Sequence, residues 1–143
     1  MKWDKTKPHA FIDGSFNPKT NTYGWGGILV ENHNVHLIQG SGSEEEEISM
    51  RNIAGELHAA LSAVDLAISL HLPEIQLLYD YIGIEKWATA TWQRNTPKTK
   101  YYALLMQDRM NLINISFIHV TAHTNIQGNE IADRLAKQSV GIL

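Results

Sequence analysis

Four acidic residues stand where a metal site built from oxygen ligands could form. Asp13 lies inside an apolar stretch, where an isolated carboxylate is costly unless a metal ion, a cation or hydrogen bonds compensate it. The other three are Glu56, Asp80 and Asp133. Carboxylate oxygens suit Mg²⁺ or Mn²⁺, and two such ions can stabilise both the attacking and the leaving oxygen of a phosphodiester. The four acids therefore predict metal-dependent phosphodiester chemistry.

Each of these acids has an ordinary explanation when it is taken alone. Asp80 closes the apolar run QLLYD, and an aspartate at a strand end often forms a turn. Glu56 flanks the packed face of a predicted helix, and glutamates on helices are usually solvated. Asp133 could pair with Arg134 or Lys137. Four carboxylates on separate elements of one small domain nevertheless favour a shared site.

Hydrophobic periodicity predicts the elements that must position these acids. Strands are predicted at residues 9–16, 23–31, 35–40, 74–80 and 115–120. Helices are predicted at residues 50–70, 83–91, 101–112 and 129–140. Ser49 is expected to cap the first helix. The acidic run 44–47 is expected to be a solvated loop, and 94–100 a basic loop around Pro97.

The order of these elements predicts an α/β fold. Short turns join the first three strands, so we expect them to be antiparallel, whereas helical crossovers lead to the last two, which should run parallel to a neighbour. The result would be a mixed five-stranded sheet with helices packed on it. The length of 143 residues suits a single domain over residues 1–143.

Composition narrows the class of protein. The chain has no cysteine, which excludes disulfides and thiolate zinc sites, and its charged N-terminus lacks the apolar segment of a secretory signal. No apolar run is long enough to span a bilayer, and we expect a cytoplasmic protein. The net charge is −3, but four of the 15 acids are proposed metal ligands and four form the run 44–47, which leaves seven against 12 basic residues. The charge does not argue strongly against a nucleic-acid substrate.

Four segments together resemble type 1 ribonuclease H. They are FIDGSF around Asp13, RNIAGEL around Glu56, LLYDYIGIEKW around Asp80, and HVTAHTNIQGNEIADRLAK around His123 and Asp133. The segments follow the order and spacing of that family, and the resemblance covers residues 11–137. The forms RNIAGE and YDYIGIEKW are most similar to members found in bacteria and in viroplasmin-linked proteins.

The resemblance implies endonucleolytic cleavage of the RNA strand of an RNA–DNA hybrid, leaving 5′-phosphate and 3′-hydroxyl ends. Two Mg²⁺ or Mn²⁺ ions would take part. Asp13 would bridge the ions, Glu56 and Asp80 would share one, and Asp133 would complete the other. His123 matches the family's histidine that assists proton transfer or product release.

The resemblance also implies which residues contact the hybrid. Asn52 and Glu56 would lie near ribose 2′-hydroxyls, which distinguish RNA from DNA. Trp87 would lie beside the DNA strand. The full set of substrate-binding positions is Gly14, Ser15, Arg51, Asn52, Trp87 and Asn129. The chain departs from the common pattern at Tyr81, where a serine is frequent, at Ile53, where a polar residue is frequent, and at Arg51, where many members have a threonine in a phosphate pocket. The basic segment 94–100 is also shorter than in many bacterial members, which affects the expected affinity for the hybrid.

Two other classes of function stay open at this point. One is another polynucleotidyl transferase on the same fold, such as a resolvase or transposase domain, which the His123 loop and the RNIAGE helix disfavour. The other is a nucleic-acid-binding module without catalysis, which the intact set of acids disfavours. We expect a monomer that acts on RNA–DNA hybrid and needs no small-molecule cofactor.

Overall fold

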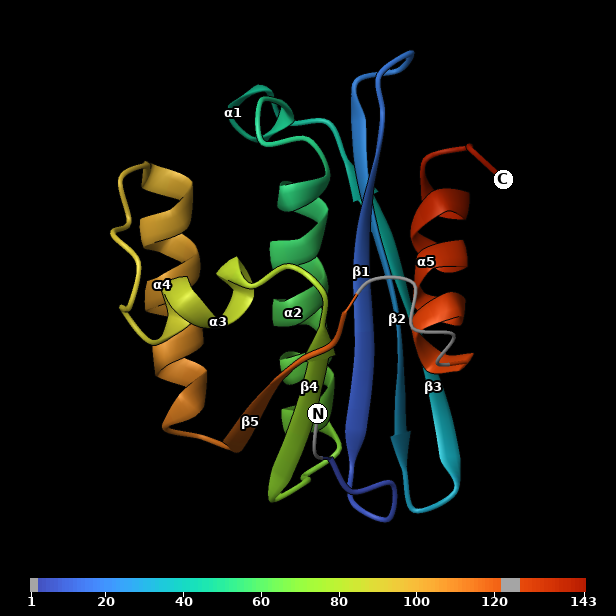
Figure 1. Ribbon diagram of the computed structural model, residues 1–143, viewed down its shortest axis with the longest axis vertical. Helices are drawn as coiled ribbons and strands as arrows, with labels where there is room; N and C mark the ends of the chain where they lie inside the picture. Colours follow the sequence, from blue (N-terminus) through green and yellow to red (C-terminus); the bar gives the residue numbers. More distant parts are fainter. Residues whose placement is uncertain (1–2, 122–126) are drawn as a thin grey trace.

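Five strands form one mixed sheet in the computed structural model, which describes residues 3–121 and 127–143 (Figure 1). They are β1 (His9–Asn17), β2 (Thr22–Glu31), β3 (Asn34–Gly42), β4 (Glu74–Tyr79) and β5 (Asn114–His119). The strand order is β3-β2-β1-β4-β5. β2 pairs antiparallel with β1 and with β3, whereas β4 pairs parallel with β1 and with β5. The expected mixed sheet is therefore confirmed, and β1 lies at its centre.

The helices pack on both faces of this sheet. They are α1 (Glu45–Ile48), α2 (Asn52–Ser69), α3 (Gly83–Ala88), α4 (Pro97–Met110) and α5 (Gln127–Ser139). Both α2 and α5 contact β1 and β2, and Figure 1 shows them on opposite sides of these strands. α4 lies beyond α2 on the same side, with α3 packed against it. No helix in the described ranges is long and apolar enough to cross a membrane.

The larger core lies between the sheet and α2. The buried face of α2 is rich in alanine, which lets the helix approach the sheet closely. Larger side chains fill the space beside it, among them Ile12, Leu29, Leu77, Tyr79 and Met106. A smaller cluster on the other face includes Phe11, Ile28, Leu78, Val120 and Ala132.

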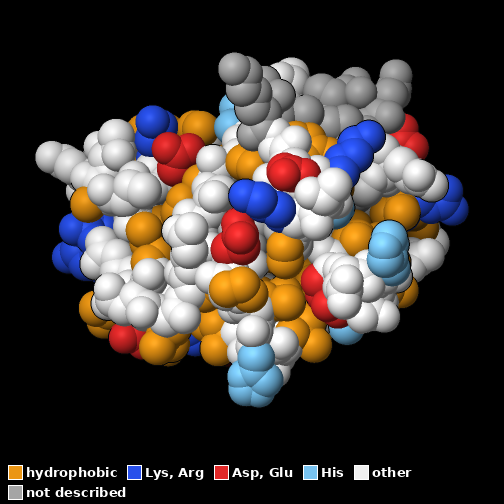
Figure 2. All heavy atoms as spheres, turned by 90° about the horizontal axis from the view of Figure 1, so that it is seen from below, with side chains coloured by type: hydrophobic (Ala, Val, Ile, Leu, Met, Phe, Trp, Pro, Cys, Tyr) orange, Lys and Arg blue, Asp and Glu red, His pale blue; other side chains and the backbone are white. Residues whose placement is uncertain are grey.

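The surface carries no single kind of side chain at the end of the molecule seen in Figure 2. Acidic, basic and hydrophobic side chains are interspersed on that face.

Two expectations for the connecting segments were wrong. The acidic run is not a solvated loop, because it contains the short helix α1, and Glu47 within it is buried. Ser49 does not cap α2, which begins at Asn52 after Arg51. Burial of Glu47 depends on partners far away in the sequence, so local polarity gave no sign of it.

The expected basic loop at residues 94–100 is also partly wrong. α4 begins at Pro97, and Thr96 caps it in a reciprocal arrangement with Thr99. Proline is favourable at the first position of a helix because its missing N–H has no partner there anyway. Lys98 and Lys100 therefore belong to a helix, and only Arg94 of the three basic residues lies in the loop.

Candidate active site

Three of the four predicted acids meet at one place on the sheet. Asp13 lies in β1, Asp80 follows the end of β4, and Glu56 lies near the start of α2. One carboxylate oxygen from each residue lies within 4.8 Å of one from each of the others. The parallel register pairs Phe11 with Leu78, so its continuation by two residues puts Asp13 beside Asp80. Neighbouring parallel strands thus supply two of the acids, and the helix supplies the third.

Glycines hold Glu56 against Asp13. A methyl group added at Gly14 would lie 2.5 Å from the backbone nitrogen of Glu56, and one added at Gly55 would overlap the backbone carbonyl oxygen of Gly24. Side chains at these positions would push the helix outward. The first turns of α2 therefore lie directly on the backbone of β1 and β2, and this contact sets the depth of Glu56.

Burial dominates the electrostatics of the three acids. Burial raises the pKa of Asp13 to about 7, and the charges of Asp80 and Asp133 act in the same direction. Burial, followed by the charge of Asp13, raises the pKa of Glu56 well above its ordinary value. The pKa of Asp80 is also raised, mainly by burial. Without a compensating cation, the site therefore resists holding all its negative charges at neutral pH.

These residues fit a divalent metal ion. Glu56 is only 2% exposed, and within the described part of the chain nothing donates a hydrogen bond to its Oε2. A buried carboxylate oxygen without a donor is costly, and a hard cation would compensate it. Three carboxylates at this separation also match the oxygen ligands that Mg²⁺ and Mn²⁺ prefer.

Asp133 lies next to this group but outside it. Its Oδ2 is 3.0 Å from Nζ of Lys137, one turn further along α5. It is close enough for its charge to raise the pKa values of Asp13 and Asp80. Lys137 is one of the two ordinary partners that the sequence suggested for Asp133. That Asp133 belongs to a set of four metal ligands stays a prediction.

The predicted substrate-binding residues border the acids from several elements. The backbone N–H of Gly14 donates to Oδ1 of Asp13 over 2.9 Å, and Ser15 follows, half-buried, in β1. Arg51 and Asn52 are exposed at the start of α2. The guanidinium carbon of Arg51 lies 4.7 Å from the centre of the Phe16 ring, within reach of a cation–π interaction.

An aromatic cluster lies directly after Asp80. The rings of Tyr81 and Trp87 are 5.8 Å apart, and Trp92 packs edge-on against Trp87 at 5.6 Å. Trp87 is half-buried in α3, and Asn129 is half-buried in the first turn of α5. The departure at Tyr81 therefore adds a ring to the group that contains Trp87.

One predicted residue lies outside the described structure, and one neighbour of the site was missed. His123 falls in residues 122–126, outside the described ranges, so its role in proton transfer stays a prediction. His119, at the end of β5, donates from Nε2 to the backbone carbonyl of Asp80 over 2.8 Å. The parallel pairing of β4 with β5, which places Tyr79 opposite His119, would have indicated this contact.

Comparison with known proteins agrees with this arrangement. Residues 5–141 match the model of the RNase H family. Human ribonuclease H1 is 29% identical over 99 residues, which cover 61% of this chain and 34% of that protein. The chain thus spans about a third of the length of this curated relative.

Several solved structures share the fold. RNase H1 of the archaeon Halobacterium salinarum aligns with a TM-score of 0.76 and 24% identity, covering 93% of this chain and 96% of that one. An N-terminal RNase H domain from Mycobacterium tuberculosis aligns with a TM-score of 0.76 and 18% identity, covering 94% of this chain and 98% of that one. LC11-RNase H1, solved in complex with an RNA/DNA hybrid, aligns with a TM-score of 0.70 and 17% identity. The alignment covers 93% of this chain and 99% of that one. By the family match over almost its whole length, the chain belongs to the RNase H family.

Proposed function

We propose that this chain is an endoribonuclease that hydrolyses the RNA strand of RNA–DNA hybrids with the help of divalent metal ions. The observation that carries the proposal is the meeting of Asp13, Glu56 and Asp80 within 4.8 Å, with a buried oxygen of Glu56 that has no donor in the described structure. Membership of the RNase H family supports the same substrate class. A related enzyme, LC11-RNase H1, has been solved with such a hybrid.

Asp13, Glu56 and Asp80 would hold Mg²⁺ or Mn²⁺, and Asp133 would complete a second ion site beside them. Bound ions would stabilise negative charge on the attacking and leaving oxygens of the scissile phosphodiester. Asp133 would then have to share its carboxylate between the ion and Lys137, which lies 3.0 Å from it. Burial of Glu56 and the close backbone contacts beside it would hold this ligand in position.

The surrounding residues would bind and orient the hybrid. Asn52 and Glu56 would contact ribose 2′-hydroxyls, and Arg51 would contact a phosphate of the backbone. Trp87 would lie beside the DNA strand. The remaining predicted contacts with the hybrid are Gly14, Ser15 and Asn129. Water would attack the scissile phosphorus and the bond to the 3′-oxygen would break, which leaves 5′-phosphate and 3′-hydroxyl ends. His123 would take a proton from this water or return one to the leaving 3′-oxygen. A group that senses several consecutive 2′-hydroxyls would disfavour a lone ribonucleotide within DNA.

A substrate panel tests this function. We expect the protein, assayed with Mg²⁺ or Mn²⁺, to cut the RNA strand of a uniform hybrid and to spare double-stranded RNA, double-stranded DNA and a four-way junction. A chelator should abolish the cutting, and a DNA duplex with one ribonucleotide should be a poor substrate. Cleavage of the junction in preference to the hybrid would instead indicate another polynucleotidyl transferase. Binding of hybrid without cleavage in either metal would indicate a non-catalytic module.

A further inference from the structure

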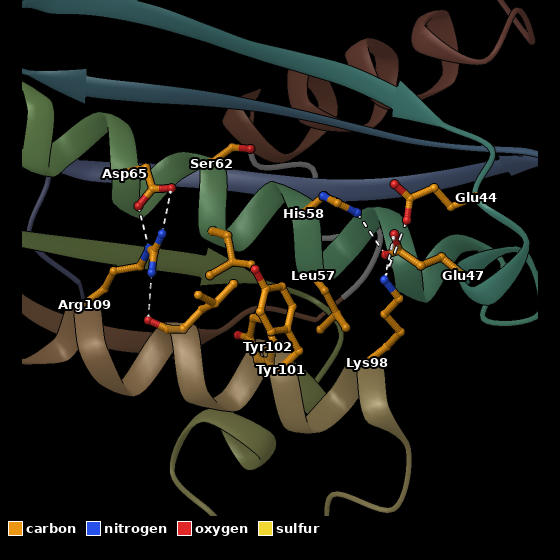
Figure 3. Close-up of a pocket in the computed structure, with 12 residues that line it drawn as sticks. Glu44, Glu47, Leu57, His58, Ser62, Asp65, Lys98, Tyr101, Tyr102 and Arg109 are labelled. Carbon is orange, nitrogen blue, oxygen red and sulfur yellow. Dashed lines mark hydrogen bonds and ion pairs between the residues drawn. The ribbon is translucent and has the colours of Figure 1, made fainter.

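A second buried carboxylate lies outside the candidate active site. Glu47, in the short helix α1, is 7% exposed. The hydroxyl of Tyr23 donates to its Oε1 over 3.0 Å, and Nε2 of His58 lies 2.9 Å from its Oε2. Nζ of Lys98 approaches Oε1 to 3.8 Å. Figure 3 shows His58 and Lys98 directed at Glu47 from α2 and α4. One carboxylate thus connects α1 to β2, α2 and α4.

The partners of Glu47 are themselves held in place. The ring of His58 stacks on Trp25 at 4.5 Å and on Tyr23 at 5.6 Å, each with an interplanar angle of 13°. Both aromatic residues belong to β2, and Tyr23 is 2% exposed. Burial and the neighbouring Glu47 raise the pKa of Tyr23 to about 12, so its hydroxyl remains a donor at neutral pH. Glu47 is therefore bound to side chains that are packed on the sheet.

α1 depends on this carboxylate for its attachment. The helix has four residues, too few for a helix to be stable by itself. Its first residues are acidic and exposed, its cap residue Glu44 makes no side-chain capping bond, and its single buried residue is Glu47. A polar network therefore anchors α1, where most helices use an apolar face.

The anchored helix leads directly into the start of α2. Backbone N–H groups of Met50 and Arg51 donate to the carbonyls of Glu47 and Ile48, each over 3.0 Å, and those of Ile53 and Ala54 donate to Met50 and Arg51. Arg51 has φ 55° and ψ −128°, a conformation that residues other than glycine rarely adopt. Such a strained residue persists only where its surroundings hold it.

We propose that Glu47 is a positioning residue, which holds Arg51 and Asn52 in place to receive the sugar–phosphate backbone of the hybrid. The inference rests on the proposed function. Glu47 touches neither substrate nor metal ion in this account; it acts through the connection at residues 48–51. Its loss should weaken the grip on the hybrid and leave the carboxylates and the chemistry in place.

Tyr23→Phe is the mildest test, because it removes only the hydroxyl that donates to Glu47. Glu47→Ala removes the whole network, Glu47→Gln keeps an acceptor for Tyr23, and Glu46→Gln is the matched control on an exposed side chain that also approaches Lys98. We expect KM for hybrid to rise about tenfold in Glu47→Ala, the size of one lost charge-assisted contact, with kcat within about twofold. Tyr23→Phe and Glu47→Gln should fall between that variant and the parent, and Glu46→Gln should match the parent.

A double-mutant cycle shows whether Glu47 acts through Arg51. In an Arg51→Ala background, Tyr23→Phe should add little to KM, since residues that work through one contact are not additive. Amide hydrogen exchange should quicken in residues 48–54 of Tyr23→Phe and remain unchanged in α4. A parent protein that fails to cut hybrid would refute the proposed function. Unchanged exchange in residues 48–54, or a fall in kcat at constant KM, would refute the positioning role of Glu47.

Discussion

The backbone of Gly55 in α2 faces the carbonyl oxygen of Gly24 in β2 so closely that a methyl group on Gly55 would overlap it. Glu56 is the next residue, so this contact between two glycines decides how deeply the Glu56 carboxylate enters the site. The two residues belong to different elements, and neither carries chemistry. The separation of Glu56 from Asp13 is therefore set by backbone packing.

Gly55→Ala should consequently impair the candidate active site. In an unobstructed helix this change would stabilise the protein by about 1 kcal/mol, because alanine is the better helix former. Here the methyl group would push α2 off the sheet, and we expect a loss of roughly 1–3 kcal/mol in the free energy of unfolding together with weaker metal binding. Urea denaturation and Mn²⁺ calorimetry would measure both, with Ser62→Ala in the same helix as control. A stabilised Gly55→Ala with normal metal affinity would contradict the packing account.

In the metal-free protein, the contribution of Asp13 to stability should fall as the pH rises from about 4 to about 7. Burial raises the pKa of Asp13 from 3.8 to about 7, so between these values the folded state holds a proton that the unfolded state has released. The contribution of Asp13 to the free energy of unfolding therefore falls with rising pH in this window. Asp13→Asn removes the titration and should be the more stable protein above pH 7 in a chelator, with the difference shrinking toward about pH 4.

Melting temperatures across this range would check the prediction, with Asp108→Asn as a matched change on an exposed aspartate of α4. Adding Mg²⁺ or Mn²⁺ should restore stability to the parent by mass action and have little effect on Asp13→Asn. A parent protein whose stability relative to Asp13→Asn stays constant from about pH 4 to above pH 7 would show that burial does not shift Asp13 in this way.

His119 should support Asp80. Its Nε2 donates to the backbone carbonyl of Asp80, so His119→Ala removes a bond that fixes the peptide carrying this carboxylate. A hydrogen bond of this kind contributes about 1 kcal/mol, which corresponds to roughly a fivefold loss of Mn²⁺ affinity. Calorimetry would compare the Mn²⁺ affinity of His119→Ala with that of His36→Ala. The control change removes a 2.9 Å pair with Glu31, near the opposite edge of the sheet. Equal affinities for both variants would leave His119 without a role at the site.

The basic residues of the α3–α4 segment should differ in their contribution to hybrid binding. Lys98 is engaged by Glu44, Glu46 and Glu47, so its charge is already neutralised within the protein. Lys100 is exposed. If this segment grips the hybrid, Lys100→Ala should reduce the salt slope of binding by roughly one unit or less, and Lys98→Ala should leave it unchanged. Binding across a salt series in Ca²⁺ would compare them, and a larger change for Lys98→Ala would reverse the assignment.

The sequence predicted those features that follow from local pattern and from strand order. Apolar runs located β1 and β4, and their parallel pairing brought Asp13 and Asp80 together. Features that depend on distant partners could not be predicted in this way. Glu47 stands in a run of acidic residues that is typical of a solvated loop, and its burial depends on Tyr23 and His58. The loop predicted around Pro97 was wrong for a different reason: the helix start there depends on the cap between Thr96 and Thr99, which is a local signal.

Turnover of a uniform RNA–DNA hybrid by the parent protein and by Asp13→Asn, compared in saturating Mg²⁺, tests the central claim most directly. The account predicts that the parent cuts the RNA strand and leaves 5′-phosphate and 3′-hydroxyl ends, whereas Asp13→Asn, still folded, shows no measurable cleavage. Near-parental turnover by a folded Asp13→Asn would contradict the account, because the carboxylate at the centre of the three-acid site would then be dispensable.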